Sequence, residues 1–526
     1  MRPSRLFRSG HGRKSLSSAG LAVAIAVSAA PATAAEPTPE EWYAAGARAV
    51  AANQRIRNVG GNARNVILFI GDGMGLSTIT AARILDGQRK GMSGEENSLS
   101  FERFPNLALI KTYSANQQVA DSAPTMSAIM TGVKTNDGVI SVNHLVDRRE
   151  KNRFKVKAAA RRTLLEWAES RGLSTGVVSS ARVTHATPAA CYAHITERDW
   201  EGDGDLPADA TVPDIAHQLI DFEYGNGLEV VLGGGRAKFL PRQSTDPEYP
   251  NAKGSRRDGK DLTAEWLRKF DRPAYVWNRA QFDAIDPEQV DHLLGLFEPG
   301  HMKYEADRAR DPAGEPDLTA MTVKAIQILA RNPKGYFLMV EGGRIDHGHH
   351  ASNAYRALTD AIALSEAVAR ARAMTSPADT LILVTADHSH VFTMGGYAKR
   401  GNPILGKVIE PGRDDFAHDA MGLPYTTLGY MNGPGHHGTS NVQRAGPKWF
   451  EHSPNHYDAD ATRADLTQVD TEAPNYLQES AIPLGSETHG GEDVAAFADG
   501  PGAHLVRGVM EQNALFHVMR EAFGWR

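Results

Sequence analysis

The segment from Val340 to His350, VEGGRIDHGHH, is rich in residue types that bind metal ions. Its glycines allow the backbone to bend tightly around an ion. A solvated, charged loop is the alternative, but the acid of this segment directly follows an apolar run, where an unpaired charge would be costly. The segment therefore favours a metal site. Its candidate ligands are Glu341, Asp346, His347, His349 and His350.

Two further segments carry the same residue types. TADHSH contains Asp387 and His388 side by side, and SETHGGEDV presents His489 before two glycines. A single histidine is more often structural than a metal ligand. Carboxylate and imidazole ligands together suit zinc, whereas oxygen ligands alone suit magnesium. Three such segments in one chain predict a site for several metal ions.

A possible nucleophile occurs in the segment VADSAPTMSA, where Asp121 directly precedes Ser122. By themselves these residues are typical of a turn or a helix N-cap. A serine hydroxyl is a weak nucleophile at neutral pH, and the chain shows no convincing serine-hydrolase motif that would supply a base. A zinc ion can deprotonate the serine instead. Two metal ions about 3.5 to 4 Å apart can stabilise the attacking and leaving oxygens of a displacement.

Short apolar runs alternate with helical patterns along the chain. The runs are continuously apolar, as in strands covered on both faces. Alternation of this kind predicts an α/β fold with a large, mostly parallel sheet and helices on both faces. The expected strands are residues 65–70, 175–180, 228–235, 335–343 and 380–388, and the expected helices are residues 158–172, 317–335 and 353–374.

The acids of the candidate site follow the expected strands. Asp72 comes after the first strand, Glu341 ends FLMVE, and Asp387 ends LILVTAD. In parallel α/β sheets, ligand-binding groups collect beyond the carboxyl ends of the strands. We therefore expect these three carboxylates to lie close together. Residues 397–484 differ from this pattern, because they are rich in Gly, Pro, Asn and His with weak periodicity, which predicts an irregular insertion.

Residues 1–34 are typical of a signal peptide. Five basic residues precede the apolar run LAVAIAVSAA, and small residues follow it. A membrane span needs about 20 apolar residues, more than this run provides. We therefore expect an exported protein, periplasmic or secreted, without a membrane span. Removing residues 1–34 changes the net charge from −6 to −11, which disfavours nucleic-acid binding. Cys191 is the only cysteine, so no intramolecular disulfide can form.

Taken in order, the motifs FIGDGMG, ADSA, VTHATPAACYAH, VEGGRIDHGHH, TADHSHVF and ETHGGEDV resemble those of the alkaline phosphatases over essentially the whole chain after residue 34. Three features resemble the animal-type branch of this family in particular: His185 in THATP, and the segments DPEYP and GLFEPG. The resemblance implies that residues 35–526 form one catalytic domain. It also implies hydrolysis of small-molecule phosphate monoesters through a phosphoserine intermediate, at two zinc ions and one magnesium ion, and a homodimer.

The resemblance also assigns roles to individual residues. Ser122 becomes the nucleophile, Arg198 the phosphate clamp, and Asp121 the residue that orients Arg198. His185 touches the magnesium ion through water. The implied ligands are Asp346, His350 and His489 for the first zinc; Asp72, Asp387 and His388 for the second; Asp72, Thr187 and Glu341 for magnesium; and Glu248, the backbone of Phe297, Glu298 and Glu315 for a possible calcium ion.

Three alternatives stay open on the sequence. A phosphodiesterase of the same superfamily is disfavoured by Arg198, which suits a dianionic monoester. A sulfatase is disfavoured because Met126 occupies the place where its motif has arginine. A secreted binding protein for phosphate or metal would be expected to have lost Ser122 or a zinc ligand. One departure from the family is Pro124, where many relatives have glycine, and it predicts a stiffer turn around an unchanged serine.

Overall fold

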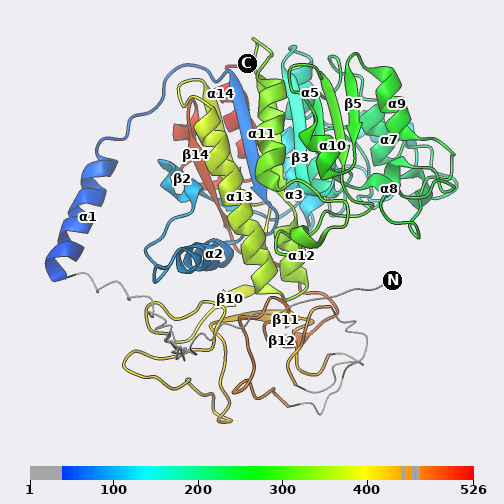
Figure 1. Cartoon of the computed structure of the whole chain (residues 1–526). Helices are drawn as coiled ribbons and strands as arrows, with labels where there is room; N and C mark the ends of the chain where they lie inside the picture. Colours follow the sequence, from blue (N-terminus) through cyan, green and yellow to red (C-terminus); the bar gives the residue numbers. More distant parts are fainter. Residues whose placement is uncertain (1–37, 440–445, 452–456, 458–461, 526) are drawn as a thin grey trace, which may run out of the picture. The chain divides into compact units, whose positions relative to one another are not determined.

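The structure is a computed structural model that describes residues 38–439, 446–451, 457 and 462–525. The predicted signal peptide lies outside these residues. The described chain contains a ten-stranded sheet with the order β15-β2-β14-β8-β1-β7-β3-β4-β6-β5 (Figure 1). Its strands are β1 (Asn65–Gly71), β2 (Asn106–Lys111), β3 (Ser174–Arg182), β4 (Val230–Gly234), β5 (Pro273–Val276), β6 (His292–Leu296), β7 (Tyr336–Gly342), β8 (Thr380–Thr385), β14 (Val494–Asp499) and β15 (Gly508–Glu511).

The sheet is mostly parallel, which confirms the predicted fold class. Among its strands, only β14 runs antiparallel to its neighbours, β2 and β8. The five apolar runs form β1, β3, β4, β7 and β8, and β1, β7 and β8 are buried along their whole length. Their residues are continuously apolar because helices cover both faces of the sheet.

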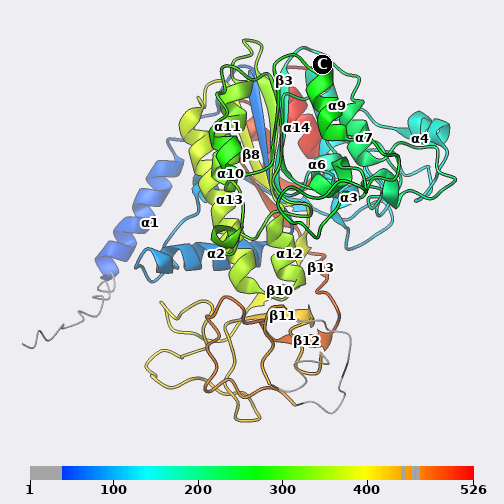
Figure 2. The same ribbon diagram turned by 45° about the vertical axis from the view of Figure 1, so that its right-hand side comes forward.

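Two layers of helices cover the sheet. One contains α2 (Leu76–Arg89), α11 (Leu318–Leu329) and α13 (Ala354–Met374), of which α13 contacts both others. The other contains α3 (Ser122–Thr131), α5 (Leu164–Glu169) and α14 (Ala514–Ala522). Figures 1 and 2 show the sheet between the two layers. The remaining helices are α1 (Pro39–Asn53), α4 (Arg153–Ala159), α6 (Ala186–Ala189), α7 (Ile215–Ile220), α8 (Arg236–Phe239), α9 (Leu262–Lys269), α10 (Arg279–Asp283) and α12 (Arg344–His350).

One expected helix is shorter than its pattern. The two later patterns form α11 and α13, but residues 158–172 are helical only at Ala158 and Ala159, the end of α4, and in α5. The hydroxyl of Thr163 accepts a hydrogen bond from the backbone N–H of Glu166, and the Glu166 carboxylate accepts one from the backbone N–H of Thr163. This capping box starts a new helix after a break, so the prediction of one continuous helix was wrong.

Residues 397–484 have little regular structure where they are described. They contain β11 (Leu428–Gly433) and β12 (Ser480–Pro483), which form a small sheet with β10 (Phe392–Met394). A separate apolar cluster of Ala464, Leu466 and Tyr476 lies in the same region. The irregular texture agrees with the sequence, whereas the limits of the insertion and of the catalytic domain stay predictions.

Candidate active site

The candidate site lies at the carboxyl end of the central strands. The register pairs Ile70 of β1 with both Glu341 of β7 and Thr385 of β8. Asp72 and Asp387 each follow these paired positions by two residues, so three carboxylates from segments far apart in sequence come together. All three are completely buried. The register therefore explains why acids at separate strand ends form one group.

The three residues expected at the first zinc form a compact group. His350 and His489 place their Nε2 atoms 3.3 and 3.4 Å from Asp346 Oδ1, and 3.3 Å from each other. Asp346 and His350 belong to α12, where a spacing of four residues puts both side chains on one helix face. His489 comes from β13 (His489–Gly490), which pairs with β9 (Ser389–His390). One oxygen and two nitrogens thus converge from two separate segments.

The histidines of the two zinc groups are held with Nε2 toward the cluster. His350 Nδ1 lies 2.6 Å from the carbonyl of Glu487, and His489 Nδ1 lies 2.8 Å from that of Ala120. A carbonyl only accepts hydrogen bonds, so Nδ1 carries the hydrogen and Nε2 keeps its lone pair. Fixing the ring through its second nitrogen is the usual support of a metal-binding histidine.

The second expected zinc group surrounds the serine. His388 Nε2 lies 3.4 Å from both Asp72 Oδ1 and Asp387 Oδ2. Ser122 Oγ lies 3.1 Å from the same nitrogen and 3.5 Å from Asp72 Oδ1. Gly73, in the turn after β1, donates its N–H to Asp387 Oδ1 at 3.1 Å. The serine and the three expected ligands therefore share one buried space.

Several oxygens in this space lack hydrogen-bond partners among the described residues: Asp72 Oδ2, Asp387 Oδ2, Glu341 Oε1 and Thr187 Oγ1. Burial raises the pKa of Asp72 well above its usual value, and the nearby carboxylates of Asp387 and Asp346 raise it further. Burial and the neighbouring His489 lower the pKa of His388, which keeps the imidazole neutral. Unpaired buried oxygens beside neutral imidazoles fit divalent cations, which supply the missing charge.

The expected magnesium residues adjoin this space. Asp72, His185 and Glu341 form a candidate metal group. Burial raises the pKa of Glu341 to about 7, although Ser179, Asp72 and Thr187 beside it act in the opposite direction. Thr187 is completely buried in α6. Hydroxyl and carboxylate oxygens from three segments fit a hard cation such as Mg²⁺.

Arg198 and Asp121 form the expected pair beside the serine. Arg198 NH1 donates to Asp121 Oδ2 at 2.9 Å, while NH2 lies 2.9 Å from His185 Nε2. Asp121 is the N-cap residue of α3, yet its side chain makes no capping hydrogen bond because it is turned toward Arg198. Pro124 lies in the first turn of α3, where proline fits without loss of a helical hydrogen bond. The residue expected to stiffen a turn therefore belongs to a helix.

Sequence reasoning missed two residues that support Asp346. His390 Nε2 lies 2.8 Å from Asp346 Oδ1, and His390 Nδ1 lies 2.5 Å from Glu487 Oε2. All three are buried. The spacing offered a signal, because His390 and Glu487 each lie two residues from an expected ligand, His388 and His489. In paired strands such residues share a face.

Two histidines of VEGGRIDHGHH serve other contacts. His349 links the insertion to the core, since its ring nitrogens lie 2.9 Å from Thr78 Oγ1 and 2.8 Å from the hydroxyl of Tyr430. His347 lies with His185 and a third histidine, His301, as a candidate metal group beside the magnesium residues. Neither residue joins the two zinc groups, so the five candidate ligands of this segment divide among different environments.

The residues expected at a calcium site form a second acidic group. Glu298 and Glu315 are buried, and the side chain of Glu248 is 1% exposed. Burial and the neighbouring carboxylates of Glu298 and Asp311 raise the pKa of Glu315 to about 9. Asp311, which sequence reasoning missed, accepts a hydrogen bond from the hydroxyl of Tyr249, as Glu298 does. Glu298 follows β6 by two residues, and the backbone N–H of Phe297 donates to the carbonyl of Gly233 at 2.8 Å.

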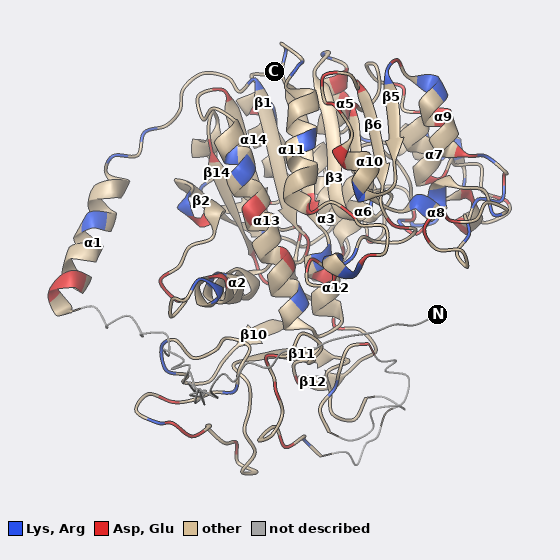
Figure 3. Ribbon diagram, in the orientation of Figure 1, with Lys and Arg blue, Asp and Glu red and all other residues tan. Residues whose placement is uncertain are grey.

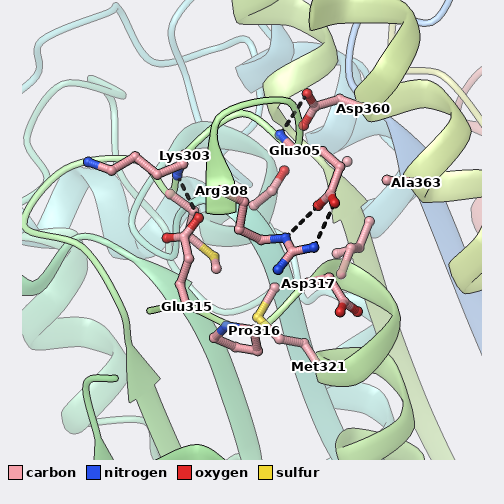
Figure 4. A pocket seen from close by; sticks show the side chains of 13 residues that line it. Lys303, Glu305, Arg308, Glu315, Pro316, Asp317, Met321, Asp360 and Ala363 are labelled. Carbon is pink, nitrogen blue, oxygen red and sulfur yellow. Dashed lines mark hydrogen bonds and ion pairs between the residues drawn. The ribbon is translucent and has the colours of Figure 1, made fainter. Parts of the chain in front are cut away.

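Basic residues reach this second group. Arg236 NH2 lies 3.0 Å from Glu248 Oε2, and Lys303 Nζ lies 2.8 Å from Glu298 Oε1. Figure 3 shows the basic α8, which contains Arg236, among acidic loops. Figure 4 shows Glu315 beside Lys303, whose backbone N–H donates to it, at a cavity of about 20 Å³. That volume holds about one water molecule.

Comparisons with known proteins agree with these observations. The sequence profile described as alkaline phosphatase matches residues 63–524. The tissue-nonspecific alkaline phosphatase of Gallus gallus is 45% identical over 93% of this chain and 90% of its own, and the alkaline phosphatase of Gadus morhua is 43% identical over 93% and 97%. The solved alkaline phosphatase of Thermus thermophilus is 25% identical, with a TM-score of 0.63 over 90% of this chain and 94% of its own.

None of the described helices has the length and apolar character needed to cross a membrane. The matches extend over nearly the whole described chain, and they agree with the ten-stranded sheet and with the groups of acids and histidines at its edge. The chain therefore belongs to the alkaline phosphatase family and is a phosphate monoester hydrolase.

Proposed function

We propose that this enzyme hydrolyses phosphate monoesters through a phosphoserine at Ser122, within a site for two zinc ions and one magnesium ion. The alkaline phosphatase family is metal-dependent, and the described residues contain candidate metal groups. The observation that carries the proposal is the position of Ser122 Oγ, 3.1 Å from His388 Nε2, beside buried carboxylates with unpaired oxygens. A metal-free pocket of this composition would strongly disfavour ionised carboxylates.

The chain's own residues orient the reaction. Ser122 attacks the phosphorus from the first position of α3, where backbone N–H groups favour a nearby anion. Arg198 presents a planar fork to two oxygens of the phosphate, and Asp121 holds the direction of that fork. Zinc, when bound, supplies Lewis-acid activation of the serine and stabilisation of the leaving oxygen. Water then hydrolyses the phosphoserine.

The assignment of ions follows the donor sets. Asp346, His350 and His489 hold the first zinc, and Asp72, Asp387 and His388 hold the second. The magnesium ligands are Asp72, Thr187 and Glu341, with His185 nearby. Glu248, Glu298 and Glu315 hold calcium together with the backbone of Phe297, and the position of Asp311 supports its addition to this set.

The enzyme is exported and forms a homodimer. Export rests on the signal-peptide pattern of residues 1–34. Dimerisation rests on the family resemblance, and Met394 and Ile482, which the register places on one face of the small sheet of β10, β11 and β12, are 44 and 45% exposed. The occupant proposed for this face is a second copy of the chain.

Phosphate release from a chromogenic monoester at alkaline pH tests the catalytic proposal. Chelation should abolish activity, and zinc with magnesium should restore it. Ser122→Ala should lower kcat by at least about 10³-fold. Ser127→Ala serves as the control, because this buried serine of the same helix donates its hydrogen bond to the carbonyl of Ala123.

Trapping the intermediate separates the proposed chemistry from other routes. Acid quenching with labelled phosphate should leave label on the native protein and on Ser127→Ala, but not on Ser122→Ala. Label at another residue, or full activity of Ser122→Ala, would show that Ser122 is not the nucleophile. A native protein that prefers diesters to monoesters would support the phosphodiesterase alternative.

A further inference from the structure

The turns that carry Asp121 and Arg198 are both hydrogen-bonded to the backbone of one residue, Gly138. The backbone N–H of Arg198 donates to the carbonyl of Gly138 at 2.8 Å, and the N–H of Gly138 donates to Asp121 Oδ1 at 3.2 Å. Arg198 NH1 closes the connection by donating to Asp121 Oδ2. Both side chains therefore depend on where Gly138 lies.

Arg148 bridges the residues directly before Gly138 and Arg198. Its NH1 donates to Asp137 Oδ2 at 2.5 Å. Its Nε and NH2 donate to the two oxygens of Glu197 at 3.0 and 2.8 Å. One guanidinium thus holds two separate turns with three charge-assisted hydrogen bonds, and two of them form a planar fork that fixes its orientation.

The fit between Arg148 and the first turn is close. Gly138 has a φ of +64°, and a Cβ added there would lie 2.4 Å from Nε and Cζ of Arg148. A larger residue at Gly138 would meet both an unfavourable backbone conformation and the guanidinium. The glycine therefore allows Arg148 to pack directly against Gly138, whose backbone links Asp121 to Arg198.

Charge supports the same arrangement. The Glu197 side chain is 2% exposed. Burial would raise the pKa of Glu197, but Arg148 and Arg149 together hold it below its usual value. Arg149 also donates to Glu197, at 2.6 Å, but its side chain is 68% exposed and its ion pair is with Glu197 alone. Of these two neighbouring arginines, the one that joins both turns is Arg148.

We infer that Arg148 is a positioning residue for phosphate recognition, which aims the Arg198 fork at the dianionic phosphate of substrate and product. This inference rests on the proposed role of Arg198. Arg148 does not contact the phosphate itself in this proposal. It acts on Arg198 through Gly138 and Glu197. Loss of Arg148 frees both turns at once, so the enzyme should bind phosphate less tightly while its nucleophile stays in place.

The inhibition constant of inorganic phosphate measures directly how tightly the site with Arg198 binds phosphate. We expect Arg148→Gln to raise the inhibition constant of phosphate and the KM of a monoester about 10-fold, the effect of losing charged hydrogen bonds. Arg148→Lys, which keeps the charge without the fork, should show a smaller rise in the same direction. Arg149→Gln is the matched control, with a change below about two-fold.

A double-mutant cycle tests whether Arg148 acts through Arg198. In Arg198→Lys, the further change Arg148→Gln should alter the phosphate inhibition constant by less than about two-fold, because coupled residues are not additive. Additive effects, or Arg148→Gln and Arg149→Gln with equal effects, would overturn the inference. Urea midpoints of each variant separate lost stability from lost positioning, since a general loss of stability leaves the inhibition constant of the folded enzyme unchanged.

The two proposals fail in different ways. If Arg198→Lys leaves phosphate inhibition unchanged, the proposed clamp is wrong, and the inference fails with it. If Arg198→Lys weakens inhibition but Arg148→Gln does not, the clamp stands and only the role of Arg148 is rejected.

Discussion

The molecule contains two buried acidic groups that balance their charge differently. In the active-site group, formed by Asp72, Asp346 and Asp387, the ion pairs are made only with histidines among the described residues. In the second group, Arg236 and Lys303 contact the carboxylates directly. Both groups follow strands of the same sheet, so their position in the fold does not explain the difference.

This difference indicates which of the two groups depends more on bound cations for its charge balance. Burial keeps the imidazole of His388 neutral, so it supplies Asp72 and Asp387 with a lone pair but no positive charge, and these two carboxylates need metal ions to balance them. The second group already has two positive side chains inside the protein. We therefore expect metal loss to be more damaging at the active site than at the second group.

The largest expected effect compares one ligand from each group. Asp346→Asn should lower kcat/KM by about 10³-fold or more, because it weakens the proposed first zinc site and removes the carboxylate that His350, His390 and His489 contact. Glu248→Gln should lower kcat/KM by less than about 10-fold, because Arg236 stays paired with Asp246. Initial rates at saturating zinc, magnesium and calcium measure both. Equal losses of kcat/KM in the two variants would show that the two acidic groups do not differ in their dependence on metal.

A smaller effect is expected from removing a positive charge from the second group. Lys303→Met should destabilise the calcium-free protein by about 2 kcal/mol, because Glu298 then loses its ion pair and keeps a neutral hydrogen bond from the hydroxyl of Tyr249, and calcium should restore most of the loss. Urea unfolding with and without calcium checks this result. Lys324→Met is the control, since that lysine donates to the carbonyl of Ile285 rather than to a carboxylate. A loss that calcium does not reduce would argue against a cation site there.

A further effect, similar in size to that of Lys303→Met and confined to high pH, concerns a pair of buried acids. Glu169 and Glu229 are buried and both bind Thr175, and neither has an ion pair among the described residues. Burial, with the neighbouring Glu229, raises the pKa of Glu169 to about 9. Burial also raises the pKa of Glu229, to about 7. Here a proton balances the charge, in place of the metal or arginine of the other two groups.

The pH dependence has a definite sign. A carboxyl with a raised folded-state pKa binds its proton more tightly when folded, so unfolding free energy falls as pH rises toward about 9 and then levels off. Glu169→Gln removes this titration and should be about 2 kcal/mol more stable than the native protein near pH 10, with a smaller difference near pH 6. Urea midpoints at both pH values measure it. A native protein that is equally stable at both pH values would contradict the raised pKa of Glu169.

The chemistry of the site could be predicted because its ligands follow strong local patterns. Asp72, Glu341 and Asp387 end continuously apolar runs, and the parallel register then aligns them. The strands at one end of the sheet lacked such a signal. In β2, Leu107 and Leu109 are exposed while Ala108 and Ile110 are buried, so a short alternating run gave no clear prediction. β14, with the sequence VAAFAD, is rich in alanine, which is depleted in strands, so its composition gave no clear signal.

Sequence alone predicted which residue types could bind metal, which serine attacks phosphate by the family resemblance, and that the central sheet is mostly parallel. Tertiary structure decided which partners support them. The contact of His390 with Asp346, the addition of Asp311 to the second acidic group, and the bridge from Arg148 to two turns all join residues distant in sequence. Such contacts depend on side-chain direction after packing, which local periodicity does not encode.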